Sequence, residues 1–242
     1  MSPTILAERV AFFVVLFQGR VGSSWLIEAL NSNPQIEAFG EKLASLHCEG
    51  PLAQNLWLKH YFADRPDAES VRGFKTKLSD VIDVHEFSSQ LIQNHCVVIL
   101  LDRINLVKQA LSWLRADELF QRRGVHNIHQ LSDRLSPSHI NAEELLKRTV
   151  LLDRGRSDLN RFVDELKLPT LHICYEDLLH NADSVFEVVQ RFLRTQTRTL
   201  TYSIVKATSD PLAAAISNLD EVMEVFCETA YFHMLSDNLD FK

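Results

Sequence analysis

The sequence is poor in the residues that mark several common classes of protein. Its 242 residues include only four cysteines, widely spaced and without a Cys-x-x-Cys pair, which argues against a disulfide framework and a structural zinc site. There are seven glycines, seven prolines and no low-complexity tract, so a long disordered linker is not expected. The cysteines, Cys48, Cys96, Cys174 and Cys227, are expected to be reduced thiols.

Positive charge and long apolar runs are also scarce. The 25 lysines and arginines face 32 aspartates and glutamates, for a net charge of -7, and no basic block occurs. A general nucleic-acid surface is therefore not expected, and an anionic ligand must be met by a few local cations and oriented amides. The early apolar run Val10–Phe17 is too short to cross a bilayer and precedes no cleavage site. A cytoplasmic location is expected, with peripheral membrane association left open.

What the sequence does contain is a series of strand and helix patterns. Three runs, Val10–Phe17, Cys96–Asp102 and Thr170–Glu176, are apolar nearly throughout, which is typical of parallel strands covered on both faces. Gln35–Phe39 and Arg72–Leu78 are weaker strand candidates. Helical patterns cover Ser23–Asn31, His85–Asn94, Leu106–Leu119, Ala142–Leu166 with a break near Gly155, and Asp183–Leu193.

Strands that alternate with helices predict an α/β domain. We expect one domain over residues 1–242, with a P-loop NTPase-like three-layer α/β/α fold and a central, mainly parallel sheet. A hydrophobic content of 46% is enough for the core of such a domain. Ligands in these folds bind beyond the carboxyl ends of the strands. The polar segment Gln121–Pro137 is predicted to be a loop or a lid.

The first predicted strand leads through a glycine turn into a helix, in the sequence AFFVVLFQGRVGSSWLIEAL of Ala11–Leu30. Such a turn offers backbone N–H groups to an anion, with the positive end of the helix dipole behind them. Ser23 and Ser24 add hydroxyl donors, and Arg20 supplies a positive charge. The usual nucleotide loop, G-x-x-x-x-G-K-[ST], has a lysine that is absent after Gly22. The turn is predicted to hold an anion; an ordinary strand-to-helix turn is the alternative.

This pattern resembles the 5′-phosphosulfate loop of the PAPS-dependent sulfotransferases, whose usual form is [KR]-x-G-[ST]-[ST]-W. In that family the donor, 3′-phosphoadenosine 5′-phosphosulfate (PAPS), is cleaved at a sulfur–oxygen bond without bound magnesium, and PAP is the product. The resemblance therefore accounts for the missing lysine and implies that no metal is used. It implies that the cofactor contacts the loop residues Gly19, Arg20, Val21, Gly22, Ser23, Ser24 and Trp25.

Two further residues have the spacing of a family phosphate site. Sulfotransferases carry an arginine after the second of these strands and a serine on the following helix, and this pair grips the 3′-phosphate of the cofactor. Arg103 and Ser112 occupy these places. An arginine fork suits a fixed phosphate because it donates two parallel hydrogen bonds. The alternative is that Arg103 is a strand-end arginine paired with Asp102.

Two later segments extend the resemblance to about Asn218. The stretch CYEDLL, Cys174–Leu179, matches the YEDL of the family, and Glu176 or Asp177 is expected to cap a helix or to bond nearby loops. The segment Val205–Asn218 resembles the late segment of bacterial carbohydrate-type and glycolipid-type members. Lys206 within it is a further candidate for contact with the cofactor; a solvated lysine is the alternative.

In-line sulfuryl transfer requires a base for the acceptor hydroxyl and stabilisation of the charge that grows on the bridging oxygen. Arg20 and the loop amides are candidates for the stabilising role. Glu41 is the candidate base, because a glutamate after a glycine occurs here in carbohydrate sulfotransferases. His47 is the alternative base, since a histidine serves in the cytosolic branch and titrates near neutrality. Lys75 and Lys77 share one face of a predicted strand and are candidates to hold the sulfuryl group or an anionic acceptor.

Several residues have an open interpretation. The two lysines would also fit a charged edge strand. A His-x-x-His pair lies in the polar segment, but no cysteine is near it and a metal site is not expected. Some aromatic residues are candidates to stack on a sugar or to pack in the core, and these are Trp57, Tyr61, Phe62 and Trp113.

The sequence therefore predicts transfer of sulfate from PAPS to a hydroxyl of an acceptor, a carbohydrate or a glycolipid. Two other functions compete with it. A P-loop kinase could use Asp102 to hold magnesium, although the missing G-K-[ST] argues against this. A non-catalytic protein could bind PAP as a sensor or scaffold and would not depend on Glu41. The identity of the acceptor and the oligomeric state, including a homo-oligomer, stay open.

Overall fold

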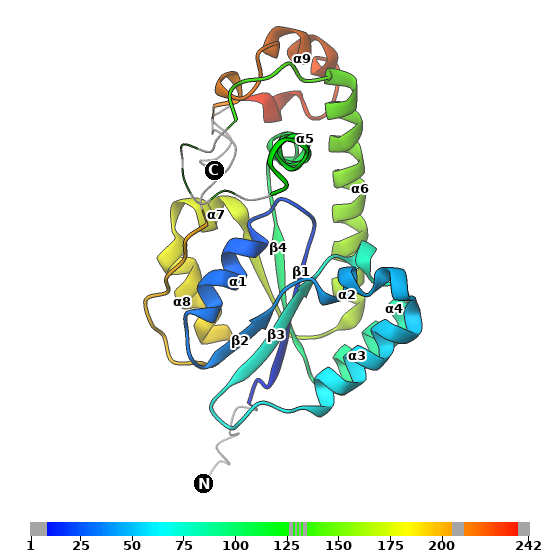
Figure 1. Ribbon diagram of the computed structural model, residues 1–242, viewed down its shortest axis with the longest axis vertical. Helices are drawn as coiled ribbons and strands as arrows, with labels where there is room; N and C mark the ends of the chain where they lie inside the picture. Colours follow the sequence, from blue (N-terminus) through cyan, green and yellow to red (C-terminus); the bar gives the residue numbers. More distant parts are fainter. Residues whose placement is uncertain are drawn as a thin grey trace.

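A computed structural model describes residues 9–125, 128, 130, 132, 135–204 and 211–236. Its centre is an all-parallel sheet of five strands in the order β2-β3-β1-β4-β5 (Figure 1). Helices cover both faces of this sheet, so the predicted three-layer α/β fold with a parallel sheet is confirmed. The strands are β1 Phe12–Phe17, β2 Ile36–Phe39, β3 Val71–Thr76, β4 Val97–Asp102 and β5 Thr170–Cys174.

The helices differ more from the sequence patterns than the strands do. The helices α1, α4, α5, α6 and α8 lie within a few residues of their predicted bounds, whereas α2, α3, α7 and α9 were not predicted. The helix α7 takes the last two residues of the predicted strand Thr170–Glu176. The α-helices are α1 Ser23–Asn31, α2 Lys42–Ser45, α3 Pro51–Ala63, α4 Val84–Gln93, α5 Leu106–Arg123, α6 Ala142–Leu166, α7 Tyr175–His180, α8 Ala182–Phe192 and α9 Leu219–Phe226. Short 3-10 turns are η1 His47–Glu49, η2 Leu78–Asp80, η4 Leu212–Ala214 and η5 Phe232–Leu235.

The central strand β1 is apolar at every position because both of its faces are covered. Phe13 and Val15 belong to the core beneath α1 and α8. Phe12 and Val14 belong to the opposite core, beneath α3, α4 and α6. Alternate residues of a strand point to opposite faces, so a strand buried on both sides needs apolar residues throughout.

The predicted break in α6 near Gly155 is wrong, because the helix runs unbroken for 25 residues. A single glycine in a helix costs about 1 kcal/mol relative to alanine and does not by itself end it. A Cβ at Gly155 would lie 2.3 Å from Nε2 of Gln18, which belongs to the loop after β1. The glycine is therefore a point of close approach between α6 and this loop.

The C-terminal part of the described chain packs against α5 and α6. Phe226 and Val222 of α9 join a third core with Leu106 and Ala110 of α5. In Figure 1, α5 is seen end-on beyond the carboxyl ends of the strands, with α9 farther out. The carboxyl edge of the sheet is thus partly covered by α5. Among the described residues, each helix is too short or too polar to span a bilayer.

Candidate functional site

The loop between β1 and α1 has the shape that the sequence predicts for an anion-binding turn. Gly22 precedes α1 with φ 80°, the left-handed region that favours glycine, and a Cβ there would lie 2.9 Å from the Tyr175 ring. In this part of the described chain, no side chain caps α1 and its first turn holds no acidic residue. Among the described residues, the first N–H groups of α1 therefore have no capping side chain as acceptor.

Three residues from two separate motifs meet beside this loop. Nε of Arg20 donates a hydrogen bond to Oγ of Ser112 on α5, at 3.1 Å. Nη1 of Arg103, directly after β4, donates to the backbone carbonyl of Arg20 at 3.2 Å. Burial is the main cause that lowers the pKa of Arg20, and the nearby charge of Arg103 adds to it. Two guanidinium groups and a hydroxyl therefore share one partly buried place, which favours an anionic ligand.

Glu176 fixes the position of Arg103. Its carboxylate accepts hydrogen bonds from the backbone N–H groups of Ile104 and Asn105, at 3.1 and 3.2 Å, and lies 3.9 Å from Nε of Arg103. Arg103 and Glu176 are each only 5% exposed, and the guanidinium lies 4.5 Å from the centre of the Tyr175 ring. Asp102, the expected alternative partner, accepts from the backbone N–H of Arg103 instead. Arg20, Arg103, Ser112 and Glu176 are called the arginine cluster below.

A second polar cluster lies on the other side of the loop. Nζ of Lys75, at the end of β3, donates to the hydroxyls of Ser24 and Ser23 at 2.8 and 3.2 Å and lies 3.1 Å from Oε1 of Glu41. Nζ of Lys77 donates to Oε2 of Glu41 at 2.6 Å. The glutamate that follows β2 is therefore joined through Lys75 to the first turn of α1.

Asp80 completes this second group, which is called the lysine cluster: Glu41, Lys75, Lys77 and Asp80. The carboxylate of Asp80 lies 3.1 Å from Nζ of Lys77. The side chain of Glu41 is 31% exposed and that of Lys77 24%, whereas that of Lys75 is 8% exposed. The cluster thus reaches from the buried loop to the protein surface.

The lysine cluster keeps Glu41 ionised. Burial is the largest single influence on Glu41 and would raise its pKa, but the hydrogen bond from Lys77 and the charge of Lys75 outweigh it and lower the pKa. For Lys75 burial prevails over the attraction of Glu41, and its pKa is lowered. For Lys77 burial is again the largest influence, but Glu41 and Asp80 together raise the pKa. The lysines therefore keep Glu41 in the ionised form that a general base needs, and they also make it a weaker base than an ordinary glutamate.

The structure brings Glu41, rather than His47, into direct contact with the lysine that touches the loop. His47 is exposed in η1, and its Nδ1 lies 3.2 Å from the backbone carbonyl of Asp80. It therefore borders the lysine cluster from outside. Which of the two residues acts as a base stays a prediction.

The remaining loop residues contribute backbone and packing. Val21 is fully buried in the core. The ring of Trp25 packs edge-on against Phe186 and Tyr202, so its side chain belongs to the core beneath α8. A Cβ at Gly19 would lie 2.7 Å from the Trp113 ring. These three residues can therefore offer a ligand their backbone groups, while their side chains or Cβ positions face packed protein.

Two of the predicted features lie outside the described residues. These are Lys206 and the His-x-x-His pair, His126 and His129. Among the described residues, no group of three His, Cys, Asp or Glu side chains could hold a metal ion.

Sequence reasoning missed Gln109, whose Nε2 donates to the backbone carbonyl of Gly19 at 2.8 Å. It lies three residues before Ser112 on α5, a spacing that places both on one helix face. That spacing was a usable signal. The contact of Glu176 with the loop after β4 had no such signal. Glu176 is 72 positions from Ile104 and 71 from Asn105 in the sequence.

Two cavities flank the site. The Trp113 pocket, about 380 Å³, lies between the loop and α6 and is lined by Gly19, Lys77, Trp113, Leu152 and Leu159. The Glu41 cleft, about 720 Å³, opens along β2 and α3 and is lined by Phe39, Glu41, Trp57, Tyr61, Asp64 and Arg72. Both volumes fall within the range of roughly 300–1,000 Å³ that is usual for small-molecule sites.

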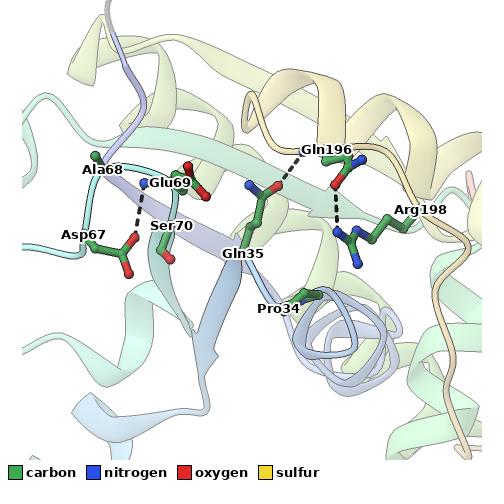
Figure 2. A pocket seen from close by; sticks show the side chains of 8 residues that line it. All are labelled: Pro34, Gln35, Asp67, Ala68, Glu69, Ser70, Gln196 and Arg198. Atoms are coloured by element: carbon green, nitrogen blue, oxygen red, sulfur yellow. Dashed lines mark hydrogen bonds between the residues drawn. The ribbon is translucent and has the colours of Figure 1, made fainter.

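A third cavity, about 470 Å³, lies at the opposite end of the sheet (Figure 2). It adjoins the amino ends of β2 and β3, and its polar groups bond one another. Gln35 accepts from the backbone N–H of Gln196 at 2.7 Å, and Arg198 donates to Gln196 at 2.7 Å. Its place is remote from the carboxyl edge, where ligands of such sheets bind.

No protein-family model and no curated protein matches this chain. Among solved structures it is similar to mouse sulfotransferase SULT7A1 complexed with PAP, at 14% identity and a TM-score of 0.45, over 79% of this chain. The chain spans 61% of the length of that protein. A sulfotransferase from Alicyclobacillus acidocaldarius has 16% identity and a TM-score of 0.49, over 94% of this chain and 96% of its own. The sulfotransferase domain from the curacin biosynthetic pathway has 13% identity and a TM-score of 0.45, over 79% of this chain and 76% of its own.

Proposed function

We propose that this protein transfers a sulfuryl group from PAPS to a hydroxyl of an acceptor. The observation that carries the proposal is the arginine cluster. Arg20 belongs to the loop motif of the sulfotransferase resemblance, Arg103 and Ser112 belong to its phosphate-site motif, and the three residues meet at one loop. Arg103 is 83 positions from Arg20 in the sequence, and Ser112 is 92 positions from it. Contacts over such separations do not follow from local patterns.

The two polar clusters suit a donor with two separate anionic groups. Arg103 and Ser112 would hold the 3′-phosphate, and the amides at the start of α1, with Ser23, Ser24 and Lys75, would hold the 5′-phosphosulfate. Nε of Arg103 is buried and has no hydrogen-bond partner among the described residues, although the carboxylate of Glu176 lies 3.9 Å from it. A buried donor of this kind is satisfied when an anion binds beside it.

PAPS would supply the activated sulfuryl group, and the chain would supply alignment, charge and a base. Glu41 would take the proton of the acceptor hydroxyl as the acceptor oxygen bonds to sulfur and the bond from sulfur to PAP breaks. Lys75 would donate to the oxygens on which negative charge grows, because it lies between Glu41 and the two serines. An acceptor hydroxyl must share Glu41 with the lysines, since both carboxylate oxygens contact an ammonium group.

Calorimetry with PAP in the presence of a chelator tests the binding half of the proposal. We expect micromolar binding by the wild type, weakened in Arg103→Ala and Ser112→Ala and unchanged in Arg122→Ala. Arg122 is a matched control because it lies on α5 but is exposed and paired with Glu118. No PAP binding by the folded wild type would overturn the proposal, and binding of ATP that requires magnesium would point to a kinase.

An assay with labelled PAPS tests the catalytic half. We expect Glu41→Gln to retain PAP binding and to lose transfer to every acceptor that the wild type sulfates. A wild type that binds PAP but shows no transfer or acceptor-stimulated turnover would point instead to a non-catalytic PAP-binding protein.

A further inference from the structure

The Glu41 cleft contains a partly open aromatic surface. Trp57 of α3 is stacked on Tyr61, with ring centres 4.9 Å apart and 30° between the planes, and meets the edge of Phe74 at 5.2 Å. Phe39, at the end of the edge strand β2, meets Tyr61 at 6.0 Å and is 39% exposed. Buried neighbours hold these rings in place, so the cleft offers a rigid apolar surface.

Fixed polar groups border this aromatic surface. Arg72 donates through Nε to Glu37 and through Nη1 to the carboxylate of Asp64, each at 2.6 Å. The side chains of Glu37 and Asp64 remain 51% and 76% exposed. The carboxylate oxygens can therefore accept further hydrogen bonds from a ligand without giving up Arg72. Rings that present an apolar face beside carboxylates suit a sugar, whose C–H face is apolar and whose hydroxyls project around it.

The balance of charges in the Glu41 cleft favours neutral sugars over negatively charged ones. Its lining has the carboxylates of Glu37, Glu41 and Asp64 against the cations of Lys42 and Arg72, with His60 as a further titratable group. Of the two lysines beside Glu41, Lys77 is also paired with Asp80. The cleft therefore lacks the excess positive charge that a polyanionic chain would need.

We propose that the acceptor is an oligosaccharide of neutral sugars that lies in the Glu41 cleft. One sugar stacks on Phe39 and Trp57 with its hydroxyls toward Glu37 and Asp64, and the next sugar places a hydroxyl at Glu41. This inference rests on the proposed function. The Trp113 pocket is the weaker place for an acceptor, because its lining includes Lys77 but not Glu41.

Saturation-transfer NMR with cellotriose and chitotriose, with and without PAP, tests the cleft independently of activity. We expect saturation of the sugar protons by the wild type and its loss in Phe39→Ala. Phe232→Ala is the matched control, because Phe232 is 40% exposed and belongs to η5, outside the cleft. PAP binding is measured for each variant, so that failure of the cofactor site is seen separately.

Kinetics with labelled PAPS and the same trisaccharides sharpen the test. We expect Phe39→Ala to raise KM for the sugar about tenfold, with kcat changed less than about twofold, as for loss of one stacking contact. Trp57→Phe, which keeps a ring, should have a smaller effect than Trp57→Leu. A heparosan oligosaccharide should be a poor acceptor.

Three results would overturn the inference. One is a wild type that binds PAP but saturates neither trisaccharide. Another is a Phe39→Ala protein with unchanged sugar binding. The third is efficient sulfation of p-nitrophenol that depends on Trp113 and not on Phe39, which would place the acceptor in the Trp113 pocket.

Discussion

The arginine cluster and the lysine cluster flank the same loop, yet they differ in how they are held. Arg103 and Glu176 are nearly inaccessible, and Glu176 is fixed by two backbone N–H groups. In the lysine cluster the contacts join side chains to side chains, and Glu41 stays 31% exposed. Backbone-anchored groups are suited to holding a ligand in one place, whereas an accessible carboxylate can meet an acceptor. Under the proposed function, the arginine cluster would hold the 3′-phosphate of the donor, and the lysine cluster would hold its sulfuryl end and supply the base.

The largest effect is expected from Glu41→Gln, which removes the proposed base and keeps the shape of its side chain. General-base catalysis contributes about 10²–10⁴-fold, so labelled-PAPS transfer should fall by that factor. The affinity for PAP should change less than about threefold, because Arg103 and Ser112 are untouched. A comparable loss of PAP affinity in calorimetry would break the division between the clusters.

Arg103→Ala should have the reverse effect. A charge-assisted hydrogen bond contributes about 1.5–3 kcal/mol, so the Kd for PAP should rise roughly 10–150-fold. Arg103→Lys should recover only part of this loss, since an ammonium group lacks the guanidinium fork. Calorimetry of Arg103→Ala and Arg103→Lys, with Arg122→Ala as the control, measures the Kd for PAP of each variant. Full recovery of the affinity by Arg103→Lys would show that charge alone matters.

The pH dependence separates Glu41 from His47 as the base. The lysines hold the pKa of Glu41 below its ordinary value despite burial, so the acid limb of kcat/KM should lie at a lower pH than that of an ordinary glutamate. Activity should therefore change less than about twofold between pH 6 and 8. Lys77→Met should move the limb to higher pH, because it removes a charge that favours the carboxylate. An acid limb that disappears in His47→Gln and persists in Lys77→Met at an unchanged pH would assign the base to His47.

The smallest effect is expected at Gly155, which touches the loop from α6. Alanine in a helix normally stabilises by about 1 kcal/mol relative to glycine, but here its Cβ would meet Gln18. In the wild type, we expect Gly155→Ala to change the free energy of unfolding by less than about 0.5 kcal/mol. In the Gln18→Ala protein, we expect the same substitution to raise the free energy of unfolding by about 1 kcal/mol. Urea unfolding of the two single variants and the double variant measures the coupling between the two sites. An equal gain in unfolding free energy from Gly155→Ala with and without Gln18→Ala would rule out the contact.

Much of the fold could be predicted from the sequence because its signals are local. Val10–Phe17 is apolar at nearly every position, which predicts a strand covered on both sides, and β1 is such a strand. Ser23–Asn31 was predicted with the bounds that α1 has. The helix α3 was not predicted, since its buried residues, Gln54, Leu58, Tyr61 and Phe62, form only a weak apolar stripe.

The candidate site was predicted residue by residue but not as an arrangement. The glycine turn and the positions of Arg103 and Ser112 follow from short motifs. Lys75 and Lys77 were expected to share a face, yet nothing in their sequence indicates that Glu41 joins both. Such contacts depend on how the carboxyl ends of β2 and β3 are placed side by side.

By itself the sequence determined the strand–loop–helix turn, the alternation of strands with helices and the residue types that offer charge to an anion. These depend on periodicity and on backbone preferences that act over a few residues. Only the tertiary structure decided that Glu176 orients Arg103, that Glu41 is shared by two lysines and that an aromatic cleft begins beside it. Those features join residues far apart in the chain, and their positions follow from strand order and helix packing, which no local pattern contains.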